Sequence, residues 1–398
     1  MLKNPLQRSL CRALLLLAIQ TAPLDATEGR ITTVSDVPAA TAIASGDLDG
    51  DGRADIALIE APPAGLPQKP SSFFLHLFFQ KQGAFTAPAD KVIALGAASP
   101  SGLAIGDFDG DGRNDIAVGL RAERSLVLFP GSHGFEKSHR SRYVNDSGAG
   151  GLSFGRINKN GLMDFLSGAA WRQWQGGDRF GEAFFAGPKF NDHWRSSLAD
   201  MDRDASPDVI FTTYVSGKSG TPSNNRIRIC YGPFLKMGIL HPTDAAQVVT
   251  LNSPFAGQES PILGKILVGD LNSDDQNDLV VPAAGQTLVY LQNSPTGFSE
   301  NANPSLVFEG ATPLLVTDLN GDGLCDMAFF PRNKDGISLW LQQKDHPISV
   351  QALSECTHIP MPRITGTVTS GDLDGDGRPE IIAGHVGGGL SLLFLFGQ

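Results

Sequence analysis

The hydrophobic positions of this chain fall in short runs that are rich in Val, Ile, Leu and Phe and are bounded by Gly, Pro or Asn. No long stretch carries a sustained helical period, so the pattern predicts β-strands. The first clear group of runs covers residues 40–45, 55–59, 73–80 and 91–95. Similar groups recur along the chain, which indicates a repeat of four-stranded units.

An acidic loop separates the first run from the second in each unit. In its clearest form it reads Asp-Leu-Asp-Gly-Asp-Gly-Arg-Ala-Asp, and an apolar strand follows at once. A β-rich repeat with a period of roughly 40–50 residues is typical of propeller blades. The loop occurs seven times, at residues 47–55, 107–115, 156–164, 200–208, 270–278, 318–326 and 372–380.

The two ends of the repeat array complement each other. After the seventh loop only two strand candidates follow, at residues 380–385 and 390–396, whereas an extra candidate at residues 30–35 precedes the first unit. Adding this N-terminal strand to the last unit would complete four strands and protect the edges of the ring. We therefore predict an all-β, seven-bladed β-propeller with four antiparallel strands per blade, closed by residues 30–35. An open β-solenoid is the alternative.

The N-terminal segment has the pattern of an export signal. Three basic residues precede an apolar run over residues 13–19, which is too short to span a bilayer, and small residues follow up to Ala26. We predict a signal peptide over residues 1–26 and one propeller domain over residues 27–398; an apolar start to a cytosolic domain is the alternative. No later run is long enough for a membrane helix. The expected location is secreted, either extracellular or periplasmic, without membrane insertion.

The net charge limits the kinds of partner that the protein can bind, and the cysteine content limits the disulfides that it can form. The net charge is −11, and cleavage after Ala26 would remove three basic residues and one acidic residue to give −13. This balance argues against nucleic acid or an anionic membrane as a partner. The predicted mature chain keeps Cys230, Cys325 and Cys356, an odd number that allows at most one internal disulfide. We expect three buried thiols and a monomeric protein.

The acidic loops place oxygen atoms at every second position, as a hard cation such as calcium requires. Loop positions 1, 3, 5 and 9 can supply side-chain oxygens, and position 7 can supply its backbone carbonyl. Position 6 favours Gly because a tight wrap around an ion needs a positive φ. Four loops meet these requirements well. Their candidate ligands are Asp47, Asp49, Asp51, Arg53 and Asp55; Asp107, Asp109, Asp111, Arg113 and Asp115; Asp318, Asn320, Asp322, Leu324 and Asp326; and Asp372, Asp374, Asp376, Arg378 and Glu380.

Two loops keep the acidic positions but lack Gly at position 6, and one loop loses its charge. Ala205 and Asp275 replace the Gly in the fourth and fifth loops, where left-handed backbone costs more, so binding there is predicted to be weaker. The candidate ligands of these two loops are Asp200, Asp202, Asp204, Ser206 and Asp208, and Asp270, Asn272, Asp274, Gln276 and Asp278. The third loop offers only Arg156, Asn158, Asn160 and Asp164. We predict about six calcium sites, and at residues 156–164 no calcium but an ion pair between Arg156 and Asp164.

The repeated Asp-x-Asp-x-Asp-Gly-x-x-Asp loop with its aliphatic strand resembles the FG-GAP (VCBS) repeat. The resemblance covers the whole predicted mature chain, although the Phe-Gly and Gly-Ala-Pro signatures of integrin alpha subunits are not recognisable in it. It implies a secreted-type, integrin alpha-like seven-bladed propeller that holds calcium in the loop between the first and second strands of a blade. It also implies a binding or adhesion role toward an extracellular protein or a carbohydrate.

Three other features could carry chemistry. Residues 151–155 match the G-x-S-x-G pattern, but that motif needs a strand-to-helix turn, and here it lies in an entering strand, so we interpret it as a chance match. The third unit concentrates aromatic residues at Trp171, Trp174, Phe180, Phe184, Phe185, Phe190 and Trp194. They form either the core of a blade or a ligand surface. The fourth unit carries insertions at residues 217–225 and 234–244. They form either a ligand-binding rim or ordinary surface loops without a binding role.

These observations favour a calcium-stabilised binding module without catalytic residues. A polysaccharide-active, lyase-like enzyme is the second hypothesis, and it requires Lys, Arg, His or Tyr side chains to converge on one rim of the central channel. A structural component of the cell envelope is the third hypothesis, which self-association would favour.

Overall fold

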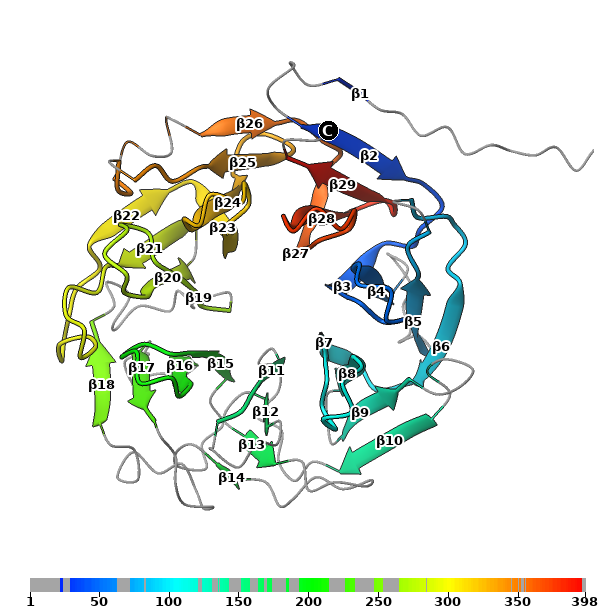
Figure 1. Cartoon of the computed structure of the whole chain (residues 1–398), viewed down its shortest axis with the longest axis horizontal. Coiled ribbons are helices and arrows are strands. Elements are labelled where there is room, and N and C mark those ends of the chain that lie inside the picture. The colour runs from blue at the N-terminus through cyan, green and yellow to red at the C-terminus, as the bar shows by residue number, and fades with distance from the viewer. Residues whose placement is uncertain are drawn as a thin grey trace, which may run out of the picture.

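A computed structural model shows an all-β chain whose sheets surround a common centre (Figure 1). The structure describes residues 22–23, 29–62, 72–81, 84–120, 124–130, 135, 137–142, 152–157, 164–167, 170–173, 184–185, 193–214, 226–232, 247–252, 265–283, 285–344, 346–349, 351, 354 and 356–395. In this part of the chain no helix is long and apolar enough to cross a membrane. The arrangement is that of a β-propeller, in which each sheet is one blade.

The described strands form antiparallel sheets, and each sheet begins with an inner strand near the centre (Figure 1). The sheets before the midpoint of the chain are β3 (Ala40–Gly46), β4 (Asp55–Glu60), β5 (Phe73–Phe78) and β6 (Lys91–Gly96); β7 (Pro100–Gly106), β8 (Asp115–Leu120), β9 (Arg124–Phe129) and β10 (Lys137–Arg142); and β11 (Leu152–Gly155), β12 (Asp164–Ser167), β13 (Ala170–Gln173) and β14 (Phe184–Phe185). The next three are β15 (His193–Ala199), β16 (Asp208–Tyr214), β17 (Arg226–Tyr231) and β18 (Gln247–Leu251); β19 (Leu267–Gly269), β20 (Asp278–Ala283), β21 (Gln286–Tyr290) and β22 (Leu306–Glu309); and β23 (Ala311–Thr317), β24 (Asp326–Pro331), β25 (Ile337–Trp340) and β26 (Thr357–Ile359).

The remaining sheet joins the two ends of the chain. It contains β27 (Ile364–Gly371), β28 (Glu380–His385), β29 (Leu390–Phe394), β2 (Arg30–Val34) and β1 (Ala22–Pro23), in that spatial order. Strand β2 pairs antiparallel with β29 from Arg30↔Phe394 to Val34↔Leu390. The guanidinium of Arg30 also lies 4.4 Å from the centre of the Phe394 ring, which adds a cation–π contact to this junction.

The predicted uniform ring of seven four-stranded blades is wrong. The closing sheet has five strands, because β1 pairs with β2 through Ala22↔Ile31 and Pro23↔Arg30. The physical reason is that the outer edge of β2 presents unpaired backbone N–H and C=O groups, which can accept a further strand. Strand β1 lies inside the segment that we predict to be a signal peptide, and cleavage after Ala26 would remove it.

The hydrophobic core lies between neighbouring sheets. Each second strand is buried on both faces; Ile56, Leu58 and Ile59 of β4, for example, are fully buried. Five described clusters each combine side chains of two adjacent sheets. The sheets that contain β3, β19, β23 and β27 each contribute to two of these clusters, so removing one of these blades would expose apolar surface on both neighbours.

Neighbouring inner strands approach one another closely at some of the residues that precede the acidic loops. A Cβ atom added at Gly269 would lie 2.6 Å from Val316 Cγ1, and one added at Gly46 would lie 2.7 Å from Ile105 Cγ2. Glycine is therefore required there for packing and not for an unusual φ. This close approach brings the acidic loops of adjacent sheets together.

Candidate metal sites in the acidic loops

The acidic loops are equivalent hairpin connections between the first and second strands of their sheets. The residue before the loop pairs with loop position 9 in every sheet, as in Gly46↔Asp55 and Thr317↔Asp326. The same register occurs at Gly106↔Asp115, Gly155↔Asp164, Ala199↔Asp208, Gly269↔Asp278 and Gly371↔Glu380. The sequence repeat therefore corresponds to one repeated structural device.

The first aspartate organises the loop by accepting backbone N–H groups. In the first loop, Asp47 Oδ1 accepts the N–H of Gly50 at 2.6 Å, and Asp47 Oδ2 accepts the N–H of Gly52 at 2.9 Å. Matching bonds hold the second, sixth and seventh loops around Asp107, Asp318 and Asp372. This network curls the backbone into the arc that a bound cation needs.

The last acidic residue of each loop is buried, and in the first, fourth, fifth and sixth loops it joins two parts of the sheet. Asp278 is fully buried; its Oδ2 accepts the N–H of Leu271 at 2.9 Å, and its Oδ1 accepts the N–H of Gln292 at 2.8 Å. Asp55 and Asp326 make the corresponding pairs of bonds. Position 9 thus ties the loop to the end of the third strand.

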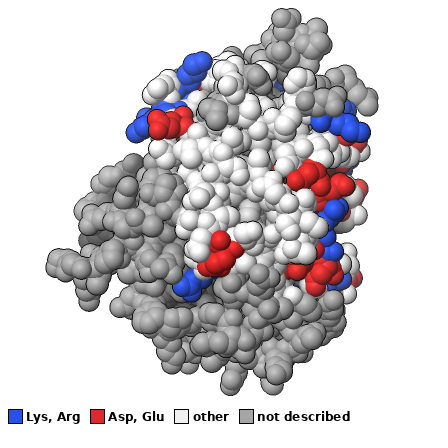
Figure 2. Space-filling view, turned by 90° about the vertical axis from the view of Figure 1, so that its left-hand side faces the viewer, with Lys and Arg blue, Asp and Glu red and all other residues white. Residues whose placement is uncertain are grey.

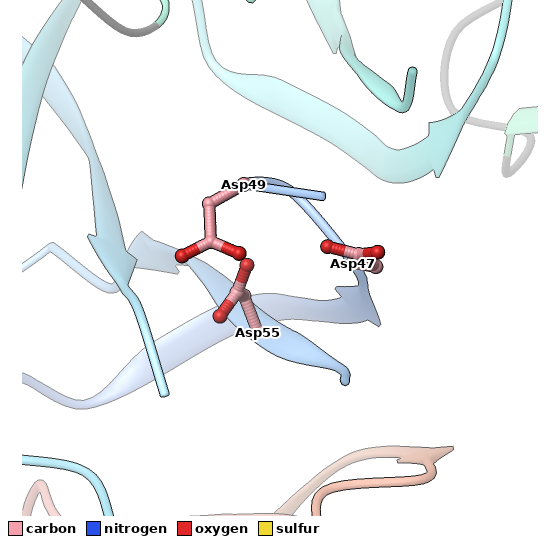
Figure 3. A group of neighbouring side chains, drawn as sticks. All are labelled: Asp47, Asp49 and Asp55. Atoms are coloured by element: carbon pink, nitrogen blue, oxygen red, sulfur yellow. The ribbon is translucent and has the colours of Figure 1, made fainter. Parts of the chain in front are cut away.

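Carboxylates at positions 1, 3 and 9 converge in four of the loops. Figure 3 shows this in the first loop, where the carboxylates of Asp49 and Asp55 point toward each other and Asp47 lies beside them. One carboxylate oxygen from each of the three residues lies within 4.8 Å of the others. The same holds for Asp107, Asp109 and Asp115, for Asp200, Asp202 and Asp208, and for Asp372, Asp374 and Glu380.

The side chain at loop position 5 is a predicted ligand, but it does not lie among the converging carboxylates. The Oδ1 atoms of Asp51, Asp111 and Asp376 each accept the N–H of the residue two positions later, at 2.8 to 2.9 Å. Asp111 Oδ2 also accepts two bonds from the side chain of Arg113, and Asp376 Oδ2 does so from Arg378. The carboxylates of position 5 are not part of the converging groups in these loops, and arginine offsets part of the charge of Asp111 and Asp376.

The fifth and sixth loops carry Asn at position 3. The amide of Asn272 accepts the N–H of Asp274 through Oδ1 at 3.2 Å and donates to Asp274 Oδ2 at 3.1 Å. Asn320 makes the same pair of bonds with Asp322 at 2.9 and 3.0 Å. These loops keep the shape of the others with one carboxylate fewer in the arc.

The expected positive φ at loop position 6 is present and is shared by position 4. Gly52 has a φ of 87° and Ala205 has one of 63°, and the preceding strained positions are Gly50 at 85° and Arg203 at 62°. The fifth loop follows with Ser273 at 59° and Asp275 at 64°. The sequence analysis predicts a positive φ at position 6 alone. The Gly-x-Gly pattern at positions 4 to 6 of the four better loops also indicates a positive φ at position 4.

The third loop lies partly outside the described residues. Asp164 is fully buried and pairs across the hairpin with Gly155, while Arg156 is exposed. Residues 158–163, and with them Asn158 and Asn160, fall outside the part of the chain that the structure describes. The absence of calcium from this loop and the ion pair between Arg156 and Asp164 stay predictions.

Side chains that were not among the predicted site residues connect several acidic loops to the preceding one. Asn114 Nδ2 donates to the carbonyl of Asp47 at 2.9 Å, and Asn277 Nδ2 donates to the carbonyl of Asp200 at 2.7 Å. The buried side chain of Gln292 donates to the carbonyl of Met201 at 2.8 Å. Gln80 and Gln342 occupy the same place after their third strands. Two recurrences in the sequence could have indicated these contacts: Asn at loop position 8 in the second and fifth loops, and Gln two residues after the third strand.

Burial and mutual repulsion make these carboxylates difficult to ionise without a cation. Removal from water raises the pKa of Asp55 to about 6 and the pKa of Asp115, Asp208 and Asp278 to about 7. Burial is also the first cause of the raised pKa of Asp49, followed in the same direction by the charges of Asp51 and Asp47. By contrast, bonds from Arg113 lower the pKa of Asp111.

The donor set fits calcium on several grounds. All the converging atoms are oxygens, as this hard cation prefers, and calcium accepts the irregular coordination geometry that such a loop offers. Asp200 Oδ1 and Asp115 Oδ1 are buried and have no hydrogen-bond partner among the described residues, an arrangement that costs free energy unless something compensates it. A divalent ion would satisfy such oxygens and favour the ionised carboxylates.

The structure tests the expectation for the cysteines, but it does not describe the side chains of the aromatic-rich unit. Cys230 is buried, whereas Cys325 and Cys356 are only half-buried, so the expectation of three buried thiols is wrong for these two. Cys325 is half-buried because it occupies loop position 8 at the rim. Side chains of the aromatic-rich unit and both insertions, residues 217–225 and 234–244, fall outside the described residues.

The acidic hairpins and the ring of sheets together define a propeller built from acidic-loop repeats. Residues 318–383 match the family model of the FG-GAP-like repeat. This stretch contains the sixth and seventh acidic loops, so the resemblance inferred from the loops is confirmed there, and nothing in it bears on an integrin-like form. A comparison with curated proteins gives no match.

Solved structures support the fold. BBS1N, in a crystal structure with ARL6DN, is similar with a TM-score of 0.53 and 10% sequence identity, over 94% of this chain and 96% of that chain. Raptor from Chaetomium thermophilum has a TM-score of 0.50 and 10% identity, over 92% of this chain and 28% of that chain. At such low identity these similarities concern the architecture alone.

Proposed function

We propose that this protein is a secreted, calcium-stabilised propeller that binds an extracellular protein or a carbohydrate. The observation that carries the proposal is the recurrence of the converging carboxylates of positions 1, 3 and 9 in linked neighbouring loops. In the face shown in Figure 2, most of the described acidic side chains lie along one edge. Calcium in these loops would neutralise part of that charge and fix the hairpins.

The role of the cation in this proposal is structural. The loops connect strands and are joined to one another through Asn114, Asn277 and the buried glutamines. A cation that orders one loop therefore steadies the surface that its neighbours present. Propeller loops are also where ligands commonly meet such folds, because a rigid scaffold positions them.

Most inner strands give no support to the lyase-like alternative. Strands β3, β7, β19, β23 and β27 carry only apolar, small and hydroxyl side chains, so they lack the basic or phenolic groups that such a site would need. Strand β15 carries His193 and Arg195, whose side chains lie outside the described part of the chain.

The test is a binding screen of the mature chain against glycans and extracellular proteins, with calcium and with a chelator. We expect at least one ligand whose affinity falls when calcium is removed, because the metal-free loops lose their fixed shape. Failure of every glycan and protein to bind would contradict the proposed function. Self-association without any other ligand would instead favour a structural role in the envelope.

A further inference from the structure

A cavity of about 250 Å³ opens between the first and second acidic loops. Its walls come from two sheets, with Asp47 and Asp49 on one side and Arg113 and Asn114 on the other. Phe79 and Phe135, which follow the third strands of these two sheets, also line it. Asp47 and Asp49 also belong to the converging carboxylates of the first loop, so this wall is shared with the calcium site proposed there, whereas the side chains of Arg113 and Asn114 belong to no such group.

We propose that this cavity binds one saccharide ring of a glycan. The inference rests on the proposed binding function and selects carbohydrate over protein as the ligand. The polarity of the walls, the size of the cavity and the fixed geometry of its lining support a saccharide ring as the ligand.

The two walls offer opposite hydrogen-bonding groups. Ionised Asp47 and Asp49 can only accept, whereas the guanidinium of Arg113 can only donate. A cationic ligand other than the calcium ion of the first loop would meet Arg113, and an anionic ligand would meet two carboxylates. A ring that carries several hydroxyl groups can donate to one wall and accept from the other, because each hydroxyl does both.

The remaining lining suits the apolar face of such a ring. Phe135 is only 3% exposed and belongs to the hydrophobic cluster between these two sheets, and half-buried Phe79 packs against the same cluster. Aromatic side chains present an apolar face of this kind. The volume lies below the roughly 300–1,000 Å³ of pockets that enclose drug-sized ligands, so a single ring is the appropriate size.

The donor wall is held in place before any ligand arrives. Asn114 Nδ2 donates to the carbonyl of Asp47 at 2.9 Å, which fixes the second loop against the first. Arg113 donates to Asp111 Oδ2 from Nε at 3.0 Å and from Nη2 at 2.5 Å. These bonds use two of the five N–H donors of a guanidinium, and a preorganised group loses less entropy on binding.

The experiment compares two variants that remove equivalent arginines. Arg113→Gln and Arg378→Gln each lose an ion pair of 2.5 Å with the aspartate at loop position 5. Arg113 lines the cavity, whereas the Arg378 side chain packs against Gly321 of the sixth loop. Both variants keep the backbone carbonyl at position 7, so they perturb their calcium loops in the same way.

Calorimetric titration in calcium would use methyl hexopyranosides and neutral oligosaccharides as probes. We expect one of them to bind, and Arg113→Gln to lower its affinity at least tenfold more than Arg378→Gln does. Phe79→Ala should weaken it as well. Equal effects of the two arginine variants would overturn the cavity proposal and leave the binding function intact. If the protein binds only proteins in the screen, the cavity proposal fails alone; if it binds neither class, both proposals fail.

Discussion

At the scale of single residues, the acidic loops combine attraction for a cation with backbone strain. Two residues of each described loop adopt a positive φ, and in the fourth loop these are Arg203 at 62° and Ala205 at 63°. The bonds to the first aspartate compensate this strain; Asp200 Oδ2, for example, accepts the N–H of Ala205 at 2.9 Å. A non-glycine residue at such a position lowers stability by roughly 1–2 kcal/mol.

We expect Ala205→Gly to raise the free energy of unfolding of the metal-free protein by up to about 1 kcal/mol, because Gly adopts a positive φ without strain. Greater chain entropy in the unfolded state offsets part of the gain. The matched control is Gly52→Ala at the same position of the first loop, where φ is 87° and an added Cβ would meet no atom within 4 Å. It should lower the free energy of unfolding by a similar amount in urea denaturation. Shifts in the same direction for both variants would contradict the strain argument.

At the scale of elements, the loops differ in the calcium affinity that their residues predict. In the first and second loops, three carboxylates converge and glycine occupies both strained positions. The third loop has only one carboxylate, at Asp164. Occupied sites stabilise the folded state by mass action, by about 1.4 kcal/mol for one site at ten times its Kd.

Asp47→Ala and Asp107→Ala should therefore reduce the rise in Tm that calcium produces, and Asn158→Ala should leave that rise almost unchanged. Each aspartate also accepts backbone N–H groups of its own loop, so the first two variants will lower the Tm of the metal-free protein as well. The informative measurement is the difference in Tm with calcium and with chelator, by differential scanning fluorimetry. An equal reduction in all three variants would contradict the ranking of the loops.

Some of these elements were predictable from the sequence and others were not. The acidic loops and the strand after each one follow from local spacing, which is why Gly46↔Asp55 and its equivalents have the expected hairpin register. The links between loops depend on residues far apart in the chain, such as Gln292 and Met201, and no local pattern reports such a contact. The fifth strand of the closing sheet was missed because its pairing uses an open sheet edge and two residues, Ala22 and Pro23, without a strand pattern.

At the scale of the whole molecule, the acidic loops form linked arcs and are not independent sites. The backbone N–H of Ala54 in the first loop donates to the carbonyl of Asp372 in the seventh at 2.8 Å, and Asn114 connects the second loop to the first. Asn277 and Gln292 connect the fifth loop to the fourth. A buried carboxylate with a raised pKa thus recurs around the propeller, and in each case burial is the first cause, followed by the charges of the same loop among those that raise it.

This arrangement predicts opposite pH dependences for the metal-free and the calcium-bound protein. In the metal-free protein, burial raises the pKa of Asp326 to about 6 and of Glu380 to about 7, from ordinary values of 3.8 and 4.5. An acid whose pKa is higher in the folded state favours folding in its protonated form. That stability is fully present below the unfolded pKa and is lost as pH rises through the folded pKa. The Tm in chelator should therefore fall between pH 5 and pH 8.

Calcium reverses the trend because it binds only the ionised carboxylates, so protons compete with it below about pH 7. For one titrating carboxylate, its affinity should fall by about tenfold per pH unit below the pKa. The rise in Tm on adding calcium should then be larger at pH 8 than at pH 5. The measurement with chelator is the control for the measurement with calcium, because groups that titrate elsewhere in the molecule change the Tm in both. Parallel curves with and without calcium would show that the buried carboxylates do not hold the ion.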